Sequence, residues 1–183
     1  MPADPRTLLD ALFEAHFDRI FAYARRRTIA LSDAEDAAAE TFVVAWRRIA
    51  DLPLSEAHQL AWLYGIARRV LANQRRAAAR RQRLADRLRA ALSVPRQPSP
   101  PTDVLDALAK LHERDQEILR LATWEGMNHT EIGLVLGISP NASAIRLHRA
   151  RRRLAATMKG SPSIRTWTGW RGSVTDPEQG EEV

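Results

Sequence analysis

Basic side chains gather in the last third of the chain, just after a short run of turn-forming residues. Arginine stands at Arg146 and Arg149 and then fills 151–153. A guanidinium group can hold a phosphate or the edge of a base through two hydrogen bonds. This pattern favours noncovalent binding of nucleic acid. The alternative is a surface helix whose arginines are only solvated.

Residues for covalent chemistry are sparse. We find no Ser/His/Asp grouping, no phosphate-binding loop and no metal-ligand pattern, and the absence of cysteine excludes disulfides and thiolate metal sites. We therefore expect no enzyme activity and no cofactor. The acidic group Asp33, Asp36 and Glu40 allows three interpretations: compensation of a helix dipole, a surface for a basic partner, or a metal-dependent nuclease or recombinase site.

The basic run belongs to a predicted helix-turn-helix. Its first helix should begin near Thr130 as N-cap, with Gly133 where two helices cross closely. Gly137 suits the left-handed position after a helix. Ser139 and Pro140 suit the cap and first position of the second helix. A basic second helix after such a turn matches the geometry of DNA reading.

The whole chain predicts an all-α protein. Strand-like alternation is nearly absent from its 183 residues, and Ala, Leu and Arg dominate. The formal net charge is +6, and arginine supplies nearly all of the positive charge. This excess of positive charge suits a nucleic-acid partner. No apolar run is long enough for membrane insertion, and 1–5 lack the features of a secretory signal. We expect a cytoplasmic protein.

Two small helical domains are expected. Residues 1–92 should form the first, with helices over 7–28, 32–49 and 56–92; Ser32 and Glu35 form a capping-box pattern at the start of the second helix. The polar side of the third becomes basic after Arg68.

A proline-rich linker should occupy 93–102. The second domain, 103–159, contains the helix-turn-helix, with Trp124 expected in its core. Residues 160–183 lose periodicity and are expected to be a mostly disordered tail.

Four passages in this order resemble the extracytoplasmic-function (ECF) branch of the bacterial sigma-70 family, over roughly 8–158. Residues 33–46 are similar to the family's region 2.2, and 61–68 to its regions 2.3 and 2.4. Residues 111–121 resemble region 4.1, and 136–151 resemble region 4.2. The resemblance implies a transcription initiation factor that binds core RNA polymerase, recognises the −35 and −10 elements of promoter DNA, and helps to melt the duplex.

The resemblance also assigns residues to each role. The surface for core polymerase would comprise Asp33, Asp36 and Glu40. The −10 element would be contacted by His58, Arg68, Arg69, Asn73 and Arg76. The −35 element would be contacted by Ser139, Asn141, Ala142, Ser143, Arg146 and Arg149.

Four positions depart from the family's usual residues. Ala39 replaces a frequent Gln, Gly65 a frequent basic residue, Ser143 an aliphatic residue and Ala144 a Lys. Loss of that Lys should lower nonspecific DNA affinity.

Two further hypotheses accompany this prediction. A helix-turn-helix regulator that binds duplex DNA without polymerase is the main alternative; the acidic face at 33–40 and the basic helix at 68–89 favour the sigma factor. An anti-sigma protein that covers the polymerase and DNA surfaces is a hypothesis from the resemblance alone.

Overall fold

The computed structural model describes residues 4–89 and 104–158, and every element in these ranges is helical. The expected linker at 93–102 and the expected tail at 160–183 lie outside the described residues. So do residues 90–92 of the third predicted helix. The first half contains α1 (Pro5–Arg25), α2 (Leu31–Arg47), the short 3-10 helix η1 (Ile49–Asp51) and α3 (Glu56–Arg89). The second half contains α4 (Val104–Ala109), α5 (Glu113–Thr123), α6 (His129–Leu136) and α7 (Pro140–Met158). The all-α prediction is confirmed.

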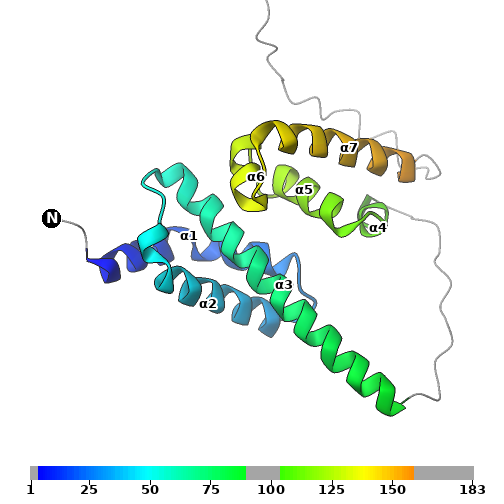
Figure 1. The fold of residues 1–183 in the computed structure, drawn as a ribbon, viewed down its shortest axis with the longest axis horizontal. Helices are drawn as coiled ribbons and strands as arrows, with labels where there is room; N and C mark the ends of the chain where they lie inside the picture. Colours follow the sequence, from blue (N-terminus) through cyan, green and yellow to red (C-terminus); the bar gives the residue numbers. More distant parts are fainter. Residues whose placement is uncertain (1–3, 90–103, 159–183) are drawn as a thin grey trace, which may run out of the picture.

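Helices α1, α2 and α3 form the N-terminal bundle, in which small residues allow close packing. Ala34, Ala37, Ala38 and Ala45 of α2 are buried. Phe42 packs against Phe13 and Phe17 of α1 with ring centroids 5.0 and 6.1 Å apart. Long α3 then crosses the pair (Figure 1).

Helices α4 to α7 form the C-terminal bundle. Ile118 and Leu121 of α5, Ile132 of α6 and Leu147 of α7 are buried in it. Gly137 has φ 69°, the left-handed conformation expected after the first helix of the helix-turn-helix. The Ala142 N–H donates to Ser139 Oγ at 3.1 Å, which confirms Ser139 as the cap of α7.

Three local predictions were wrong. Asn128, not Thr130, caps α6: its Oδ1 accepts from the N–H groups of Thr130 and Glu131, and Glu131 completes a capping box. Helix α2 starts one residue before Ser32, and its N-cap position, Ala30, makes no side-chain capping bond.

Trp124 is the third correction, because it is 39% exposed rather than in the core. It ends α5, and the Arg120 guanidinium lies 5.7 Å from its ring centroid. The indole therefore covers the edge of the bundle, where a cation can pack on its face.

The two bundles pack directly against each other through α3 and α6, and their buried apolar residues form one continuous core. In Figure 1, α3 lies between the α1–α2 pair and the C-terminal bundle. The described residues therefore show the two bundles in contact, which the sequence did not indicate.

Candidate nucleic-acid interface

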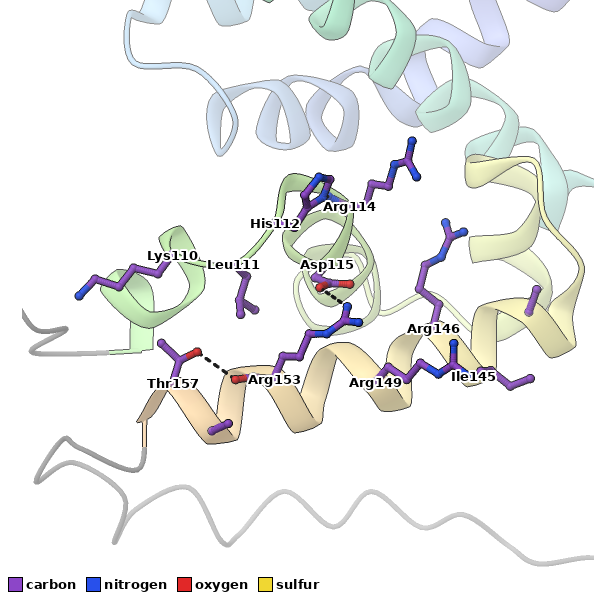
Figure 2. Close-up of a pocket in the computed structure, with 12 residues that line it drawn as sticks. Lys110, Leu111, His112, Arg114, Asp115, Ile145, Arg146, Arg149, Arg153 and Thr157 are labelled. Carbon is purple, nitrogen blue, oxygen red and sulfur yellow. Dashed lines mark hydrogen bonds and ion pairs between the residues drawn. The ribbon is translucent and has the colours of Figure 1, made fainter. Parts of the chain in front are cut away.

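A groove of about 1040 Å³ runs between α5 and α7 of the C-terminal bundle. Arg146 and Arg149 line it from α7, and Lys110 and Arg114 line it from the opposite side (Figure 2). Positions 142, 146, 149 and 153 recur at three- and four-residue steps, so they share one face of α7. The groove thus presents several cationic groups from two elements, an arrangement suited to a phosphate backbone.

Asp115 is the acidic residue in this groove. Its side chain is almost buried, and its Oδ2 accepts a hydrogen bond from Arg153 Nη1 at 2.6 Å (Figure 2). This pair ties the end of α7 to the start of α5. It therefore fixes the width of the groove and neutralises the carboxylate that would repel an anion.

The six predicted −35 residues fall into three groups. Ser139 and Asn141 are exposed at the start of α7, and Arg146 and Arg149 line the groove. Ala142 is half-buried at the groove wall. These five lie together at the end of the helix-turn-helix that a major groove would meet.

Ser143 differs from the other five. It is completely buried, and its Oγ lies 3.4 Å from Nδ1 of His129 on α6. Its side chain is therefore not available to DNA in this structure, and the expected base contact is corrected to a packing role between α6 and α7. Helical spacing carried a signal of this burial, because Ser143 lies four and seven residues before the buried Leu147 and Ala150. The family that the sequence resembles also usually has an aliphatic residue at this position.

The predicted −10 residues lie along α3. Arg69, Asn73 and Arg76 are exposed at three- and four-residue steps and form one stripe, with Asn73 Oδ1 accepting a hydrogen bond from Arg76. His58 is half-buried near the start of the helix. This stripe offers cations beside an amide, which can contact both backbone and base edges.

Arg68 lies on a different face of α3 from that stripe. Positions 65, 68, 72 and 75 share one face, since they also recur at helical steps. Gly65 lies against α6, and Arg75 forms an ion pair with Glu113 of α5. Arg68, which is half-buried, therefore lies on the side of α3 that the C-terminal bundle covers.

The acidic group on α2 is exposed, as expected. Asp33, Asp36 and Glu40 follow each other at three- and four-residue steps along one face. Glu40 Oε2 accepts a hydrogen bond from Gln74 of α3 at 3.2 Å. Val43 and Trp46 are exposed one turn further on, so the carboxylates lie beside an apolar patch. Charge next to exposed apolar surface is typical of a protein-binding face.

Sequence reasoning missed a buried group of charges between the bundles. We call Tyr23, Arg26, Arg27, Glu117 and Glu125 the interdomain charge cluster. Arg27 Nε donates to Glu117 Oε2 and its Nη1 to Glu125 Oε1, both at 3.0 Å. Tyr23 donates its hydroxyl hydrogen to Glu117 Oε1 at 2.7 Å, and Arg26 pairs with Glu125.

Burial and charge act in opposite directions on the pKa values in this cluster. Burial alone would raise the pKa of Glu117, but the charge and hydrogen bond of Arg27, with the hydrogen bond of Tyr23, bring it below 4.5. Burial, followed by the nearby Glu117 charge, raises the pKa of Tyr23 well above 10. Both groups therefore keep the protonation states that their hydrogen bond requires at neutral pH.

Among 4–89 and 104–158, no group of three or more His, Asp or Glu side chains is placed to hold a metal ion.

His16 lies on the apolar face of α1 and is half-buried there. Burial, followed by the charge of Arg19, lowers the pKa of its imidazole. None of the described helices combines the length and apolar character that a membrane crossing needs.

Comparison with known proteins agrees with this geometry. Residues 12–81 match the family model of sigma-70 region 2, and 102–154 match that of sigma-70 region 4. The RNA polymerase sigma factor CarQ of Myxococcus xanthus is 32% identical over 152 residues, covering 78% of this chain and 84% of CarQ. The ECF sigma factor SigL of Mycobacterium tuberculosis strain H37Rv is 28% identical over 158 residues, covering 83% of this chain and 89% of SigL.

Solved structures show the same fold. CnrH, in complex with the cytosolic domain of CnrY, superposes with a TM-score of 0.58 at 27% identity, over 85% of this chain and 90% of CnrH. RpoE of Bartonella quintana, in complex with the anti-sigma factor NepR, gives a TM-score of 0.62 at 21% identity, over 82% of this chain and 96% of RpoE. With both family regions matched in order, the chain belongs to the sigma-70 family of transcription initiation factors, in its ECF subfamily.

Proposed function

We propose that this sigma factor uses three separate surfaces to bring core RNA polymerase to a promoter. The α5–α7 groove binds the −35 element through Ser139, Asn141, Ala142, Arg146 and Arg149. The exposed stripe on α3, with His58 and Arg68, binds the −10 element and holds the melted strand. The acidic face of α2 docks on the polymerase core.

The observation that carries this assignment is the separation of acidic and basic side chains onto different helices. The carboxylates Asp33, Asp36 and Glu40 project from α2, while the arginines that line the groove belong to α5 and α7. Opposite charges on different elements suit two different partners, since a single anionic ligand would be repelled by the first surface. An acidic protein face is a poor DNA surface but a good one for a basic protein partner.

The chain acts in this scheme without covalent chemistry of its own. The polymerase forms the phosphodiester bonds, and the sigma factor supplies binding and position. The work takes place in the cytoplasm, with the polymerase. An anti-sigma protein is a further proposed partner, supported by the complexes of CnrH with CnrY and of RpoE with NepR.

Run-off transcription tests this function. Purified core polymerase is incubated with genomic DNA fragments, with and without the full chain, and the transcripts are mapped. We expect discrete start sites that depend on the chain and disappear with the Asp36→Ala/Glu40→Ala variant. Tight duplex binding without any new transcript would overturn the proposal and favour a regulator that acts without polymerase.

A further inference from the structure

An apolar hollow opens on the C-terminal bundle, between α4, α5 and the end of α7. Its volume is about 100 Å³, and its walls include Leu105 and Leu108 of α4, Trp124 after α5, and Leu154 of α7. Leu105 is 61% exposed and Trp124 is 39% exposed. Exposed apolar side chains that are gathered around a hollow are typical of a surface that another segment covers.

Two arginines complete the wall of this hollow, Arg120 from α5 and Arg151 from α7. Burial lowers the pKa of both guanidinium groups, and the charge of Arg27 adds to this effect at Arg120. Among the residues that the structure describes, none that lines the hollow is acidic. A guanidinium group stacks on an aromatic face and pairs with a carboxylate. The hollow therefore suits an occupant that offers aromatic rings together with negative charge.

The hollow and the cationic groove lie on opposite sides of α7. Arg149 and Arg153 line the groove, whereas Arg151 lines the hollow. Two positions along an α-helix correspond to a rotation of about 200° around its axis, so Arg151 points almost directly away from its two neighbours. An occupant of the hollow therefore leaves the groove open.

The chain continues from the end of α7 close to this hollow. Leu154 precedes Met158, the last residue of α7, by about 6 Å along the helix. Figure 1 shows the end of α7 next to α4, which it contacts. Trp167 and Trp170 follow in the sequence. Even the nine residues from Met158 to Trp167 span up to about 30 Å when extended, so both rings can reach the hollow.

The segment 159–183 has the chemistry that the hollow suits. It contains two of the five tryptophans of the chain, followed by the acidic residues Asp176, Glu178, Glu181 and Glu182, and no basic residue occurs from 172 to 183. Because a short connection tethers the two tryptophans to α7, their effective concentration at the hollow is on the order of millimolar. A separate protein or a second copy of the chain would need a similar concentration to compete with them.

We propose that residues 164–171 of this chain dock on the hollow, with Trp167 and Trp170 against Leu105, Trp124 and the two guanidinium groups. The acidic residues that follow complement the positive charge of the rim. The chain thereby covers its own apolar face while the cationic groove stays open, and a protein that binds this face must first displace the segment. The docking goes beyond the proposed function and does not depend on it.

Nuclear magnetic resonance relaxation of the full ¹⁵N-labelled chain tests the docking. The N–H groups of Trp167 and Trp170 should give order parameters near the value of rigid backbone, about 0.85. Leu105→Gln removes an exposed apolar wall of the hollow and should lower these values below about 0.6. Ala109→Gln is the matched control and should leave them unchanged, because Ala109 is exposed on the same helix but does not line the hollow.

Two results would overturn the docking. One is a set of order parameters below about 0.6 in the unchanged chain, and the other is equal values in Leu105→Gln and Ala109→Gln. Circular dichroism should show the same helix content in both variants, so that a loss of order reports on the segment. Order that appears only as the protein concentration is raised would identify a second copy as the occupant and would also overturn the proposal.

The reciprocal substitutions test the same contact from the other side. Trp167→Ser/Trp170→Ser should shift the methyl signals of Leu105 and Leu108, whereas Val174→Ser, in the same segment, should not. Trypsin cleavage after Arg165 should be severalfold faster in Leu105→Gln than in Ala109→Gln, because cleavage follows the population of the undocked segment. Equal cleavage rates, or unchanged methyl signals, would contradict the docking.

Duplex DNA separates the docking from the proposed function. Since the groove and the hollow lie on opposite sides of α7, a saturating duplex should leave the order parameters of Trp167 and Trp170 unchanged. Release of the rings by DNA would overturn their placement on this hollow. A chain that binds no DNA and gives no transcript would count against the proposed function alone, because the docking is measured in the free chain.

Discussion

Gly133 and Ile138 approach each other so closely that no other residue fits at position 133 without movement: a Cβ atom on Gly133 would lie 2.7 Å from the carbonyl oxygen of Ile138. The backbone of the same two residues is also joined by a hydrogen bond: the Ile138 N–H donates to the Gly133 carbonyl oxygen at 3.0 Å. The turn of the helix-turn-helix is therefore folded tightly back on α6. Its compactness fixes the direction in which α7 leaves the turn.

Gly133→Ala should destabilise the C-terminal bundle by about 1–3 kcal/mol, because the added methyl forces the turn backbone to shift. Urea unfolding monitored by circular dichroism measures the change. Gly65→Ala is the matched control, since it makes the same substitution in a helix with ordinary contact distances and should be neutral or stabilising by up to about 1 kcal/mol. Equal effects of the two substitutions would contradict the steric account.

Arg149→Gln should lower the affinity for duplex DNA that carries the −35 element, and it should reduce the slope of log K against log salt by about one. The reason is the loss of one cation from the groove. Fluorescence anisotropy at several salt concentrations gives both values. Arg152→Gln removes an exposed arginine of α7 that does not line the groove, and it should change the slope less. Identical slopes for the two variants would mean that the groove is not the DNA surface.

Asn141→Ala should relax the promoter preference at one −35 base pair, with a loss of about 1–3 kcal/mol of discrimination, because an exposed amide is removed from the start of α7. Ser143→Ala should leave the preference unchanged, because Ser143 is buried. Competition binding with single-base variants of the −35 duplex compares the two. A change of preference in Ser143→Ala alone would restore the original assignment of that residue.

Asp36→Ala/Glu40→Ala should weaken association with core polymerase about tenfold or more, or at least about 1.4 kcal/mol, by removing two exposed carboxylates from one face of α2. Duplex DNA binding by the free chain should not fall. Glu35→Ala is the control, since Glu35 is exposed on the same helix but lies outside the 33–36–40 stripe. Fluorescence anisotropy should show weaker core binding for Asp36→Ala/Glu40→Ala and nearly unchanged core binding for Glu35→Ala. Affinity would then depend on the 33–36–40 stripe rather than on net charge.

Glu117 should make stability depend on pH in the acid range. Its pKa in the fold lies below 4.5, so its stabilising effect is fully present above about pH 4.5 and is lost as the pH falls through the lowered value. Tyr23 has the opposite sign: its pKa is raised, so its effect is present below about pH 10 and is lost as the pH rises through the higher value.

The difference in urea midpoint between the unchanged chain and Glu117→Gln measures this contribution. It should be constant around neutral pH and shrink towards zero in acid, since both chains then carry a neutral group at position 117. Arg27, Arg120, Tyr23 and Glu125 all interact electrostatically with this cluster, so the difference between the two chains, not either curve alone, is the informative quantity. A difference that grows in acid would contradict the assigned sign.

The sequence by itself determined the helical class, the turn of the helix-turn-helix and the identity of the chemical groups on each surface. These depend on neighbours along the chain: Gly137 needs only its own backbone conformation, and Ser139 caps amides within three residues. The exposed stripe of Asp33, Asp36 and Glu40 likewise follows from helical spacing alone. The N-cap of α6 was predicted wrongly, because Asn128 and Thr130 are both suitable capping residues and lie only two positions apart.

Only the tertiary structure decided which side chains are covered. Ser143 and Asn141 are both small polar residues at the start of one helix, yet α6 buries the first and leaves the second exposed. Arg27 lies two residues after the end of α1, but Glu117 and Glu125, 90 and 98 positions later, make it the centre of a buried cluster. Long-range pairing depends on which helices meet, and no spacing within a single helix encodes that.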